Sequence, residues 1–560
     1  MRHTAAPYNV RAALRAVFNE IHASSRPATR FPQRREFHDY FVTHLPSSSL
    51  TPDKTHPSHH KLPRSASEPH SGPSNRSSQI PSSSRDTTIV RIPLKSAKHH
   101  FGAGVSRGSR PYNEDTYQAG TVEIPAFAQK QPVSISRRQT YGDQSQGSTR
   151  DTGDPQVFYF GVFDGHGGSE CSEFLRDRLH GYIEEAALLF GMESTLKDTD
   201  AESDAEGGIM GEQDAEDLQK SLVSSWKETV GGYFKRFRPE HFPALANGDE
   251  PATDHNNSIE TVLTYAFLKA DLDFTTAQAA KHSKEGGADH KTQNNPQSSV
   301  NDPVIDDKPI NENDMLFHPE REASQNLRKR PASRGSSPNL DSPIGGSTRF
   351  KGGSTASIAL LSTPTPTPFW HPNSPSTLVV AHVGDTRILL CRTSDGGAVP
   401  LTANHHPSMP TETRRLRRYA ASFVTDSFGE ERVLGLANTR AFGDIGSKRI
   451  GVSAEPQLTT VQLQPAGYSF IVLVSDGVSG HLEDQEIVDI VKDARTPDQA
   501  AKNLVSFAVE TAGDADNATA LVVRLGGWER RSEGGGGSLG TKERRDFRRQ
   551  EAADPRASRQ

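Results

Sequence analysis

The 560-residue sequence has little of several features that mark common protein classes. It has two cysteines, Cys171 and Cys391, far apart in the chain. This excludes a disulfide-rich scaffold, and we expect both to be reduced thiols packed as small apolar side chains. No apolar run approaches the roughly 20 residues that cross a membrane. The net charge is −6, without a basic excess. We therefore expect neither a membrane span nor a nucleic-acid partner.

Apolar residues are also scarce, at 33%, whereas the chain holds 37 prolines and 46 glycines. This composition predicts that much of the chain does not pack into a core. We expect a Ser/Pro/His-rich disordered linker at 45–98 and one folded domain at 99–526. Insertions are expected at about 189–216 and 275–350, where apolar periodicity is lost. Residues 527–560 read as a disordered charged tail.

The first 44 residues are short of acids. They contain seven arginines and no lysine, and no acid precedes Glu20, while Val10, Leu14 and Phe18 share one helical face. An arginine-rich, acid-poor, amphipathic N-terminus is typical of a mitochondrial transit peptide, so 1–44 predicts a mitochondrial protein. The sequence does not distinguish matrix from intermembrane space. A disordered basic tail is the alternative.

The most informative stretch of the sequence is VFYFGVFDGHGG, residues 157–168. Val157–Phe163 is rich in residues that favour buried strands, and the glycines behind it end the strand sharply. Such a strand delivers Asp164 and His166 to a sheet edge, where the backbone of Gly165 can also face a ligand. On its own, an Asp-Gly pair after a strand is usually a simple turn.

Further acids stand at comparable strand ends and turns, several beside glycine. With Asp164 they are Glu114, Asp115, Asp476 and Asp516. Clustered carboxylates repel one another and hold protons unless cations neutralise them. Ligands that are all oxygen favour Mg²⁺ or Mn²⁺ over Zn²⁺. If the strands share one sandwich, these acids can converge on such ions.

Two side chains close in sequence to these acids, Arg110 and His166, suit phosphate chemistry. A pair of divalent ions activates water at neutral pH and clamps the oxygens of a phosphoryl group. His166 is placed to protonate a leaving alkoxide, and Arg110 offers a planar fork for phosphate oxygens. The composition and spacing suggest a metal-dependent phosphoesterase.

The remaining pattern predicts both strands and helices. Runs at 357–361, 378–383 and 387–391 are expected to form an antiparallel meander. Helices are expected at 484–492 and 497–511. A further helix at about 411–420 carries four arginines, which form either a solvated face or a contact for a phosphoprotein.

Taken together, these motifs resemble the type 2C, metal-dependent protein serine/threonine phosphatases. The match covers about 100–526 outside the two insertions, and the joint order of the motifs is far more specific than any one of them. In chain order they are Arg110-x-x-Asn113-Glu114-Asp115, Val162-Phe163-Asp164-Gly165-His166-Gly167-Gly168, Gly352-Gly353-Ser354-Thr355-Ala356, Val383-Gly384-Asp385-Thr386-Arg387, Glu412-x-x-Arg415-Leu416, Thr439-Arg440-Ala441-Phe442-Gly443-Asp444, Val452-x-Ala454-Glu455-Pro456, Ser475-Asp476-Gly477 and Asp516-Asn517-Ala518-Thr519.

The resemblance implies an α+β fold, an α/β/β/α sandwich of two antiparallel sheets between helix layers. It implies two Mg²⁺ or Mn²⁺ ions in a cleft at one sheet edge, bridged by Asp164. The Gly165 carbonyl would bind one ion, and Asp476 and Asp516 the other. Glu114 would contribute directly or through water.

The resemblance also implies the catalytic roles. Asp115 would support metal-bound waters, Arg110 would hold the phosphate, and His166 would act as general acid. The nucleophile would be a metal-bridging hydroxide that attacks phosphoserine or phosphothreonine. Departures from the family pattern at Asn404 and at Ser479-Gly480, where acids are usual, predict a weak or absent third ion.

Phosphoproteins are therefore the expected partners, and we expect a monomer, although no sequence pattern tests this. Two alternatives stay open. One is a phosphoesterase of the same mechanism that acts on a small molecule. The other is a catalytically weak regulator of the same fold that binds phosphoproteins, favoured by the missing third-site acids and the long insertions.

Overall fold

The computed structural model describes residues 40–46, 87–93, 100–130, 155–196, 212–245, 257–285, 344–417 except 347 and 366, 423–425, 431–433, 437–532 and 539–553. All of these belong to the compact unit Phe37–Gln560.

The first sheet is antiparallel and has the order β15-β9-β8-β5-β4. Strand β5, Val157–Phe163, lies between β8 and β4 and has the bounds that its apolar run predicts. Every residue of β5 is buried because both faces of the sheet are covered. The other strands are β4 (Thr116–Val122), β8 (Ala356–Ser362), β9 (Ser376–Val383) and β15 (Gln457–Leu463).

The second sheet is also antiparallel, with the order β11-β10-β16-β17-β3. Its strands are β3 (Phe101–Ser106), β10 (Arg387–Arg392), β11 (Ala398–Pro400), β16 (Tyr468–Val474) and β17 (Ala518–Arg524).

Side chains that alternate along the strands form three apolar layers. Phe158 and Phe160 of β5 face the second sheet, where they join residues such as Ile471. Tyr159 points the other way, into the layer of helices. These helices are α2 (Glu170–Leu189), α3 (Glu212–Thr229) and α4 (Ile259–Glu285), and the opposite layer contains α9 (Asp484–Lys492) and α10 (Pro497–Thr511).

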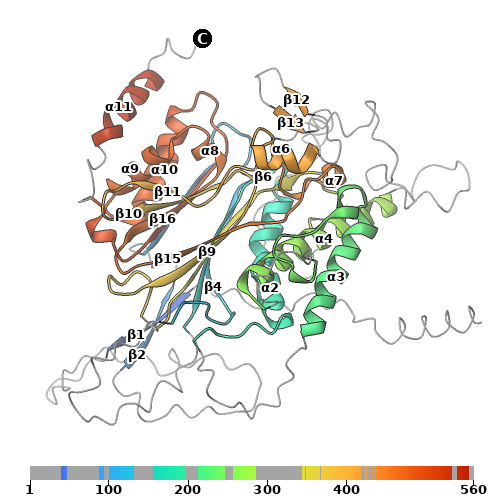
Figure 1. Ribbon diagram of the computed structural model, residues 1–560. Helices are drawn as coiled ribbons and strands as arrows, with labels where there is room; N and C mark the ends of the chain where they lie inside the picture. Colours follow the sequence, from blue (N-terminus) through green and yellow to red (C-terminus); the bar gives the residue numbers. More distant parts are fainter. Residues whose placement is uncertain are drawn as a thin grey trace, which may run out of the picture. The chain divides into compact units, whose positions relative to one another are not determined.

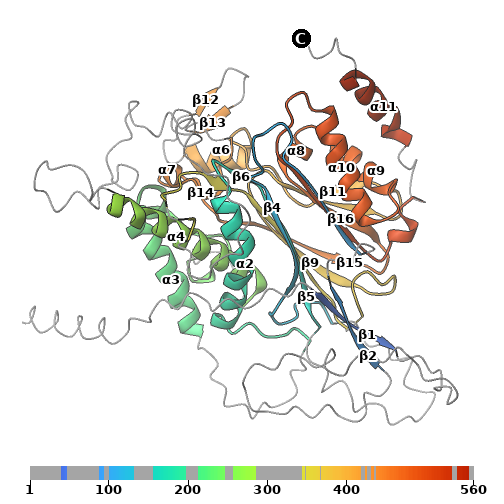
Figure 2. The same ribbon diagram turned by 180° about the vertical axis from the view of Figure 1, so that it is seen from behind.

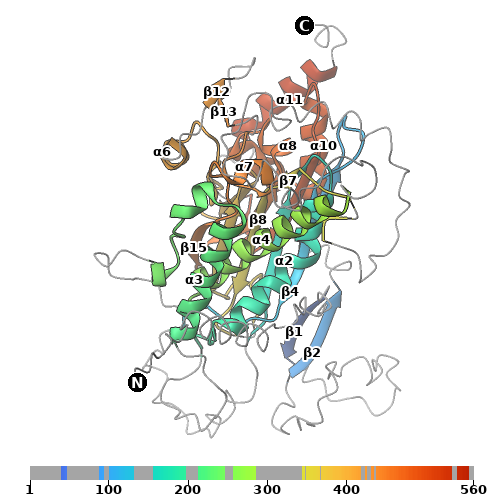
Figure 3. The same cartoon turned by 90° about the vertical axis from the view of Figure 1, so that its right-hand side faces the viewer.

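The arrangement is the predicted α/β/β/α sandwich. Figures 1 and 2 show the sheets between the layer of α2 (teal), α3 and α4 (green) and the red α9–α10 layer. Figure 3 looks onto the α2–α4 side. Helices α9 and α10 have the predicted bounds. Short elements join the layers: β6 (Gly165–His166), β7 (Gly353–Ser354), β14 (Phe442–Gly443), α6 (Pro410–Arg417), α7 (Ile445–Lys448), α8 (Asp476–Ser479), the hairpin β12–β13 (Phe423–Thr425, Glu431–Val433) and the 3₁₀ turns η4 (Gly232–Arg236), η5 (Pro243–Leu245) and η7 (Trp528–Arg530).

The predicted meander is wrong at its second connection. Strands β8 and β9 pair as expected, but β10 pairs with β11 and β16 instead of β9. The turn after Val383 therefore carries the chain from one sheet to the other. Gly384 makes this possible with φ of 109°, and a Cβ on it would lie 2.5 Å from the Thr355 side chain.

The expectation of a disordered tail over 527–560 is wrong for the part that the structure describes. Trp528 is buried, and helix α11, Leu539–Ala553, packs on α9 and α10. The contacts are ionic: Arg548 Nη1 lies 3.2 Å from Glu486 Oε2, and Arg545 Nη2 lies 3.2 Å from Asp493 Oδ2. A helix held by charge lacks the apolar periodicity on which sequence prediction depends.

Both insertions are narrower than expected. Phe190 and Met192 are buried just after α2, and α3 begins at Glu212, which leaves 197–211 outside the described residues. Helix α4 continues to Glu285, and its Gln278 Nε2 donates to the carbonyl of Ile344 at 2.9 Å. Residues 286–343 lie outside the description.

The expected linker over 45–98 contains a strand, β2 (Thr87–Pro93), which pairs antiparallel with β1 (Tyr40–Pro46). The threonine, isoleucine and valine of β2 favour this pairing. The transit-peptide prediction for 1–44 falls almost wholly outside the described residues, and its last residues belong to β1. In the part that the structure covers, no helix is long and apolar enough to cross a bilayer.

Candidate metal centre

Three aspartates converge at the edge shared by the two sheets. Ligand oxygens of Asp164, Asp385 and Asp476 all lie within 4.8 Å of one another. Asp164 follows β5 in the first sheet, and Asp476 follows β16 in the second. Asp385 sits in the turn that crosses between the sheets. The site therefore exists only where strands of both sheets end together.

The backbone around Asp164 is tightly held. Its carbonyl accepts hydrogen bonds from Thr355 N at 2.8 Å and from Ser354 Oγ at 3.0 Å. The next residue, Gly165, has no room for a side chain, because a Cβ there would lie 2.6 Å from the carbonyl oxygen of Glu114. The Gly165 backbone can therefore approach a ligand closely.

The three carboxylates destabilise one another's charge. Burial and then the charge of Asp476 raise the pKa of Asp385 to about 7. The same two causes raise the pKa of Asp164, and burial raises the pKa of Asp476. Mutual repulsion in a partly dry site makes the folded protein hold protons here.

Asp115 lies beside this group. It is 5% exposed, and its Oδ2 accepts from Ser475 Oγ at 2.8 Å. Ser475 Oγ in turn accepts from Thr519 N at 2.9 Å. Burial raises the pKa of Asp115 to about 7. This chain of hydrogen bonds ties Asp115 to the residue directly before Asp476.

Two predicted site residues instead bind each other. Arg110 Nη2 lies 2.7 Å from Asp516 Oδ2, with 55% and 38% of the two side chains exposed. Asp516 is still close enough that its charge raises the pKa of Asp476. Glu114 donates its backbone N–H to Asn517 Oδ1 at 2.7 Å, and burial raises its own pKa. Among the described residues, the three-aspartate group includes neither Glu114 nor Asp516.

His166 has a carboxylate partner. Its Nε2 lies 2.9 Å and 3.0 Å from the two oxygens of Asp444, which is 5% exposed, whereas 39% of the His166 side chain is exposed. Partial loss of water opposes a positive charge on the ring, but Asp444 outweighs this and raises the pKa of His166 to about 9. The ring is therefore kept in its protonated form at neutral pH.

Sequence reasoning missed Asp385 and Asp444 as site residues. Both lie in motifs that the sequence analysis quotes, and both stand directly after a glycine in a turn. A glycine directly before an aspartate in a turn is the sequence pattern that could have identified them. It is the reverse of the Asp-Gly order at 164 and 476.

The residues fit a divalent cation. Three carboxylates offer oxygens at ligand spacing, and the cluster carries excess negative charge that a cation would relieve. Asp385 Oδ1 is buried and, among the described residues, has no hydrogen-bond partner, although Asp385 Oδ2 accepts from Asn438 Nδ2 at 3.0 Å. A free, buried acceptor facing such a cluster is what a cation-binding carboxylate needs.

These pKa shifts predict how metal stabilises the protein. A carboxyl whose pKa is raised on folding stabilises the metal-free protein below its unfolded pKa of about 4, and this stability is lost as the pH rises through about 7. Cations compete with the same protons. We expect the rise in melting temperature with Mg²⁺ or Mn²⁺ to be larger at about pH 8 than at about pH 5.5, as measured by thermal unfolding. A rise independent of pH would contradict this.

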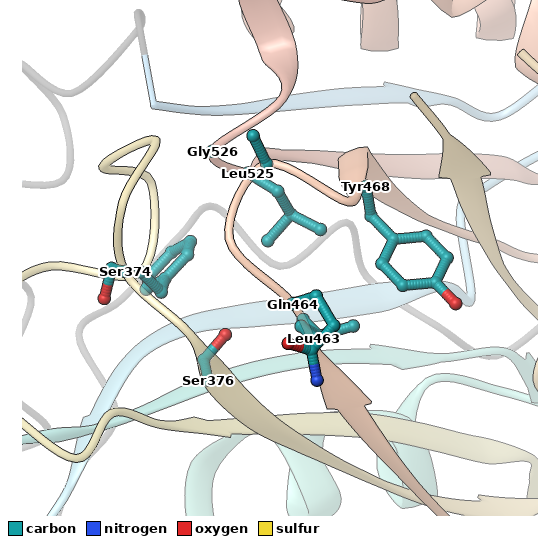
Figure 4. Close-up of a pocket in the computed structure, with 9 residues that line it drawn as sticks. Ser374, Ser376, Leu463, Gln464, Tyr468, Leu525 and Gly526 are labelled. Atoms are coloured by element: carbon teal, nitrogen blue, oxygen red, sulfur yellow. The ribbon is translucent and has the colours of Figure 1, made fainter. Parts of the chain in front are cut away.

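A small pocket lies at the opposite ends of the same strands (Figure 4). Ser376 begins β9 and Tyr468 begins β16, the two strands whose far ends lead to Asp385 and Asp476. The lining has no carboxylate, histidine or cysteine. It consists of Phe369, Ser374, Ser376, Leu463, Gln464, Ala466, Tyr468, Leu525 and Gly526.

Two helix-covered antiparallel sheets with converging carboxylates at their shared edge agree with the class of protein that the sequence motifs resemble, the type 2C phosphatases. Comparison with known proteins places the chain within that class. Residues 291–517 match the family model described as protein phosphatase 2C. The chain is 30% identical over 444 residues to protein phosphatase 2C homolog 4 of Schizosaccharomyces pombe, covering 79% of this chain and 84% of that protein. The chain belongs to the protein phosphatase 2C family, whose members are serine/threonine phosphatases.

Two other similarities are more limited. A mitochondrial protein phosphatase 1K of Xenopus laevis is 38% identical over 177 residues, which cover 31% of this chain and 44% of that protein. A serine-threonine phosphatase 2C from Toxoplasma gondii, of known structure, is 16% identical with a TM-score of 0.39, covering 76% of this chain and 94% of that one.

Proposed function

We propose that this phosphatase hydrolyses phosphoserine and phosphothreonine in proteins with Mg²⁺ or Mn²⁺ held at the shared sheet edge. The observation that carries the proposal is the convergence of Asp164, Asp385 and Asp476 from both sheets. Ions held there would supply positive charge, which lowers the pKa of bound water and offsets charge on the phosphoryl oxygens. Asp516, Glu114 and the Gly165 carbonyl would complete the ligands.

The chain's own residues supply orientation and a proton. Arg110 presents a planar fork for the phosphate oxygens once it exchanges Asp516 for substrate. His166 holds a proton and gives it to the leaving alkoxide, and Asp444 fixes the ring through Nε2. The proton on Nδ1 is the one left for transfer. Asp115, anchored by Ser475, orients water in the site.

We propose two ions, with a third bound weakly. Asn404 and Gly480 stand where the resemblance leads us to expect acids. Asp385 keeps one further carboxylate at the cluster, so its presence supports some residual binding of a third ion.

The test is hydrolysis of a phosphothreonine peptide by the full chain with Mn²⁺ and with EDTA. We expect turnover that requires Mn²⁺ and resists inhibitors of serine or cysteine nucleophiles, because the proposal uses neither. Folded, metal-loaded protein that binds the peptide without turnover would contradict the proposal and favour the phosphoprotein-binding regulator. Turnover of small phosphate esters alone would favour a small-molecule phosphoesterase.

We further propose that the enzyme acts on mitochondrial phosphoproteins. The arginine-rich composition of residues 1–44 and the mitochondrial name of the Xenopus relative support this. A fluorescent protein fused to residues 1–44 is expected to enter mitochondria, whereas the same fusion with its seven arginines replaced by glutamine is not. Diffuse fluorescence of the unmutated fusion would count against mitochondrial targeting.

A further inference from the structure

A fully buried ion pair lies behind the turn that holds the partner of His166. Asp271, on α4, and Lys448, on α7, are both 0% exposed, and Lys448 Nζ lies 2.5 Å from Asp271 Oδ2. Neither residue contacts the acid cluster through any interaction in the described structure. Separating either charge from its partner in such an interior is costly, so the pair fixes the two helices relative to each other.

The same two side chains hold the backbone that leads into Asp444. Asp271 Oδ1 accepts from Gly443 N at 2.9 Å, and Lys448 Nζ donates to the carbonyl of Ala441 at 2.7 Å. The backbone N–H of Gly443 and the carbonyl of Ala441 are thus hydrogen-bonded by a carboxylate and an ammonium group that lie outside the turn.

The turn needs this support because its backbone is unusual. Asp444 has φ of 45° and ψ of 48°, the left-handed region that side-chain-bearing residues seldom adopt. Gly443 before it has φ of 70°, and a Cβ there would lie 2.6 Å from the carbonyl of Gly352. Strained backbone persists only where its surroundings over-determine it.

The conformation of this turn points the Asp444 carboxylate at His166. Both Asp444 oxygens lie within 3.0 Å of His166 Nε2, and β14, which ends at Gly443, shares a small sheet with β6, which contains His166. The hydrogen-bonded path from α4 to the ring therefore has three links: Asp271, the 443–444 turn, and the Asp444 carboxylate.

We propose that Asp271, with Lys448, is a positioning residue for the proton transfer by His166. The proposal rests on the proposed function, in which His166 protonates the leaving group. Asp271 touches neither substrate nor metal, and acts by holding the turn that aims Asp444. No motif marks it, because it sits in the middle of an ordinary helix.

The test separates proton transfer from other roles by the leaving group. An alkoxide leaving from a phosphothreonine peptide needs a proton, whereas the weakly basic phenolate of p-nitrophenyl phosphate leaves without one. For Asp271→Asn in the full chain with Mn²⁺, we expect kcat on the peptide to fall roughly 10-fold or more, with kcat on the aryl ester within about 3-fold of wild type. Asp273→Asn, two residues along α4, is the matched control and should change neither activity. Asp273 pairs with Lys269 and accepts from Tyr182 Oη at 3.0 Å, and the asparagine amide oxygen can still accept this hydrogen bond.

A purely structural role would lower both activities together, and that outcome, or no change in either, would overturn the proposal. If Asp271→Asn fails to fold, the double variant Asp271→Asn/Lys448→Gln removes both charges at once and gives the same reading. In a His166→Gln background, Asp271→Asn should have no further effect on the ratio of the two activities. Failure of the proposed function would show separately, as a wild-type protein without Mn²⁺-dependent peptide hydrolysis.

Discussion

Replacing Asp476 with asparagine is expected to lower kcat/KM on a phosphothreonine peptide by roughly 10³-fold or more. Asp476 contributes one of the three carboxylates of the acid cluster and is the first residue of α8. Loss of its charge weakens cation binding, and bound cations supply several kcal/mol of transition-state stabilisation, where each factor of ten in rate is about 1.4 kcal/mol.

The same variant should not destabilise the metal-free fold. Asp476 raises the pKa values of Asp164 and Asp385 by repulsion, so a neutral amide relieves this repulsion. We expect an unchanged or higher melting temperature without metal and a smaller rise when Mn²⁺ is added. Asp395→Asn, at an exposed turn that pairs with Arg392, is the matched control and should behave as wild type. Near-normal turnover by folded Asp476→Asn would refute the assignment of the cluster as the metal centre.

Replacing His166 with glutamine gives the second large effect. Peptide hydrolysis should fall by roughly 10²–10⁴-fold, the usual contribution of general acid catalysis, because glutamine cannot give a proton to the alkoxide. Hydrolysis of an aryl phosphate should fall much less, since its leaving group needs no protonation. Steady-state kinetics on both substrates measures the difference.

Asp444→Asn provides a companion to this experiment. Its amide can still contact His166 Nε2, but it removes the negative charge that keeps the ring protonated. We expect a smaller loss in the same direction, again selective for the peptide. An equal loss on both substrates for His166→Gln would mean that the ring binds phosphate or water instead of donating a proton.

Local sequence patterns predicted much of the fold. The apolar run at 157–163 predicts the bounds of β5, and the apolar stripes at 484–492 and 497–511 predict those of α9 and α10. This works because burial in the sandwich imposes a regular spacing of apolar residues that is visible within a single segment. The acids at 164 and 476 were likewise visible as residues that end buried strands.

The errors arise where the structure depends on distant partners. Nothing in residues 378–391 indicates that β9 and β10 belong to different sheets. The local pattern therefore predicts a hairpin turn around Asp385 and does not place this residue in the cluster. Helix α11 depends on acids some 60 residues earlier in the chain, such as Glu486. The bond between His166 and Asp444 spans 278 positions, which no local pattern records.

The crossing of the chain between the two sheets at Gly384 has a consequence for the stability of the protein as well as for its chemistry. Asp164 follows a strand of one sheet, Asp476 follows a strand of the other, and Asp385 lies in the turn between them. An ion bound to all three would therefore hold the two sheets together at this edge. The free energy of holding the ion is then also free energy of keeping the sheets together. The supply of divalent cations in its compartment would thus govern how long each molecule survives, and not only how fast it works.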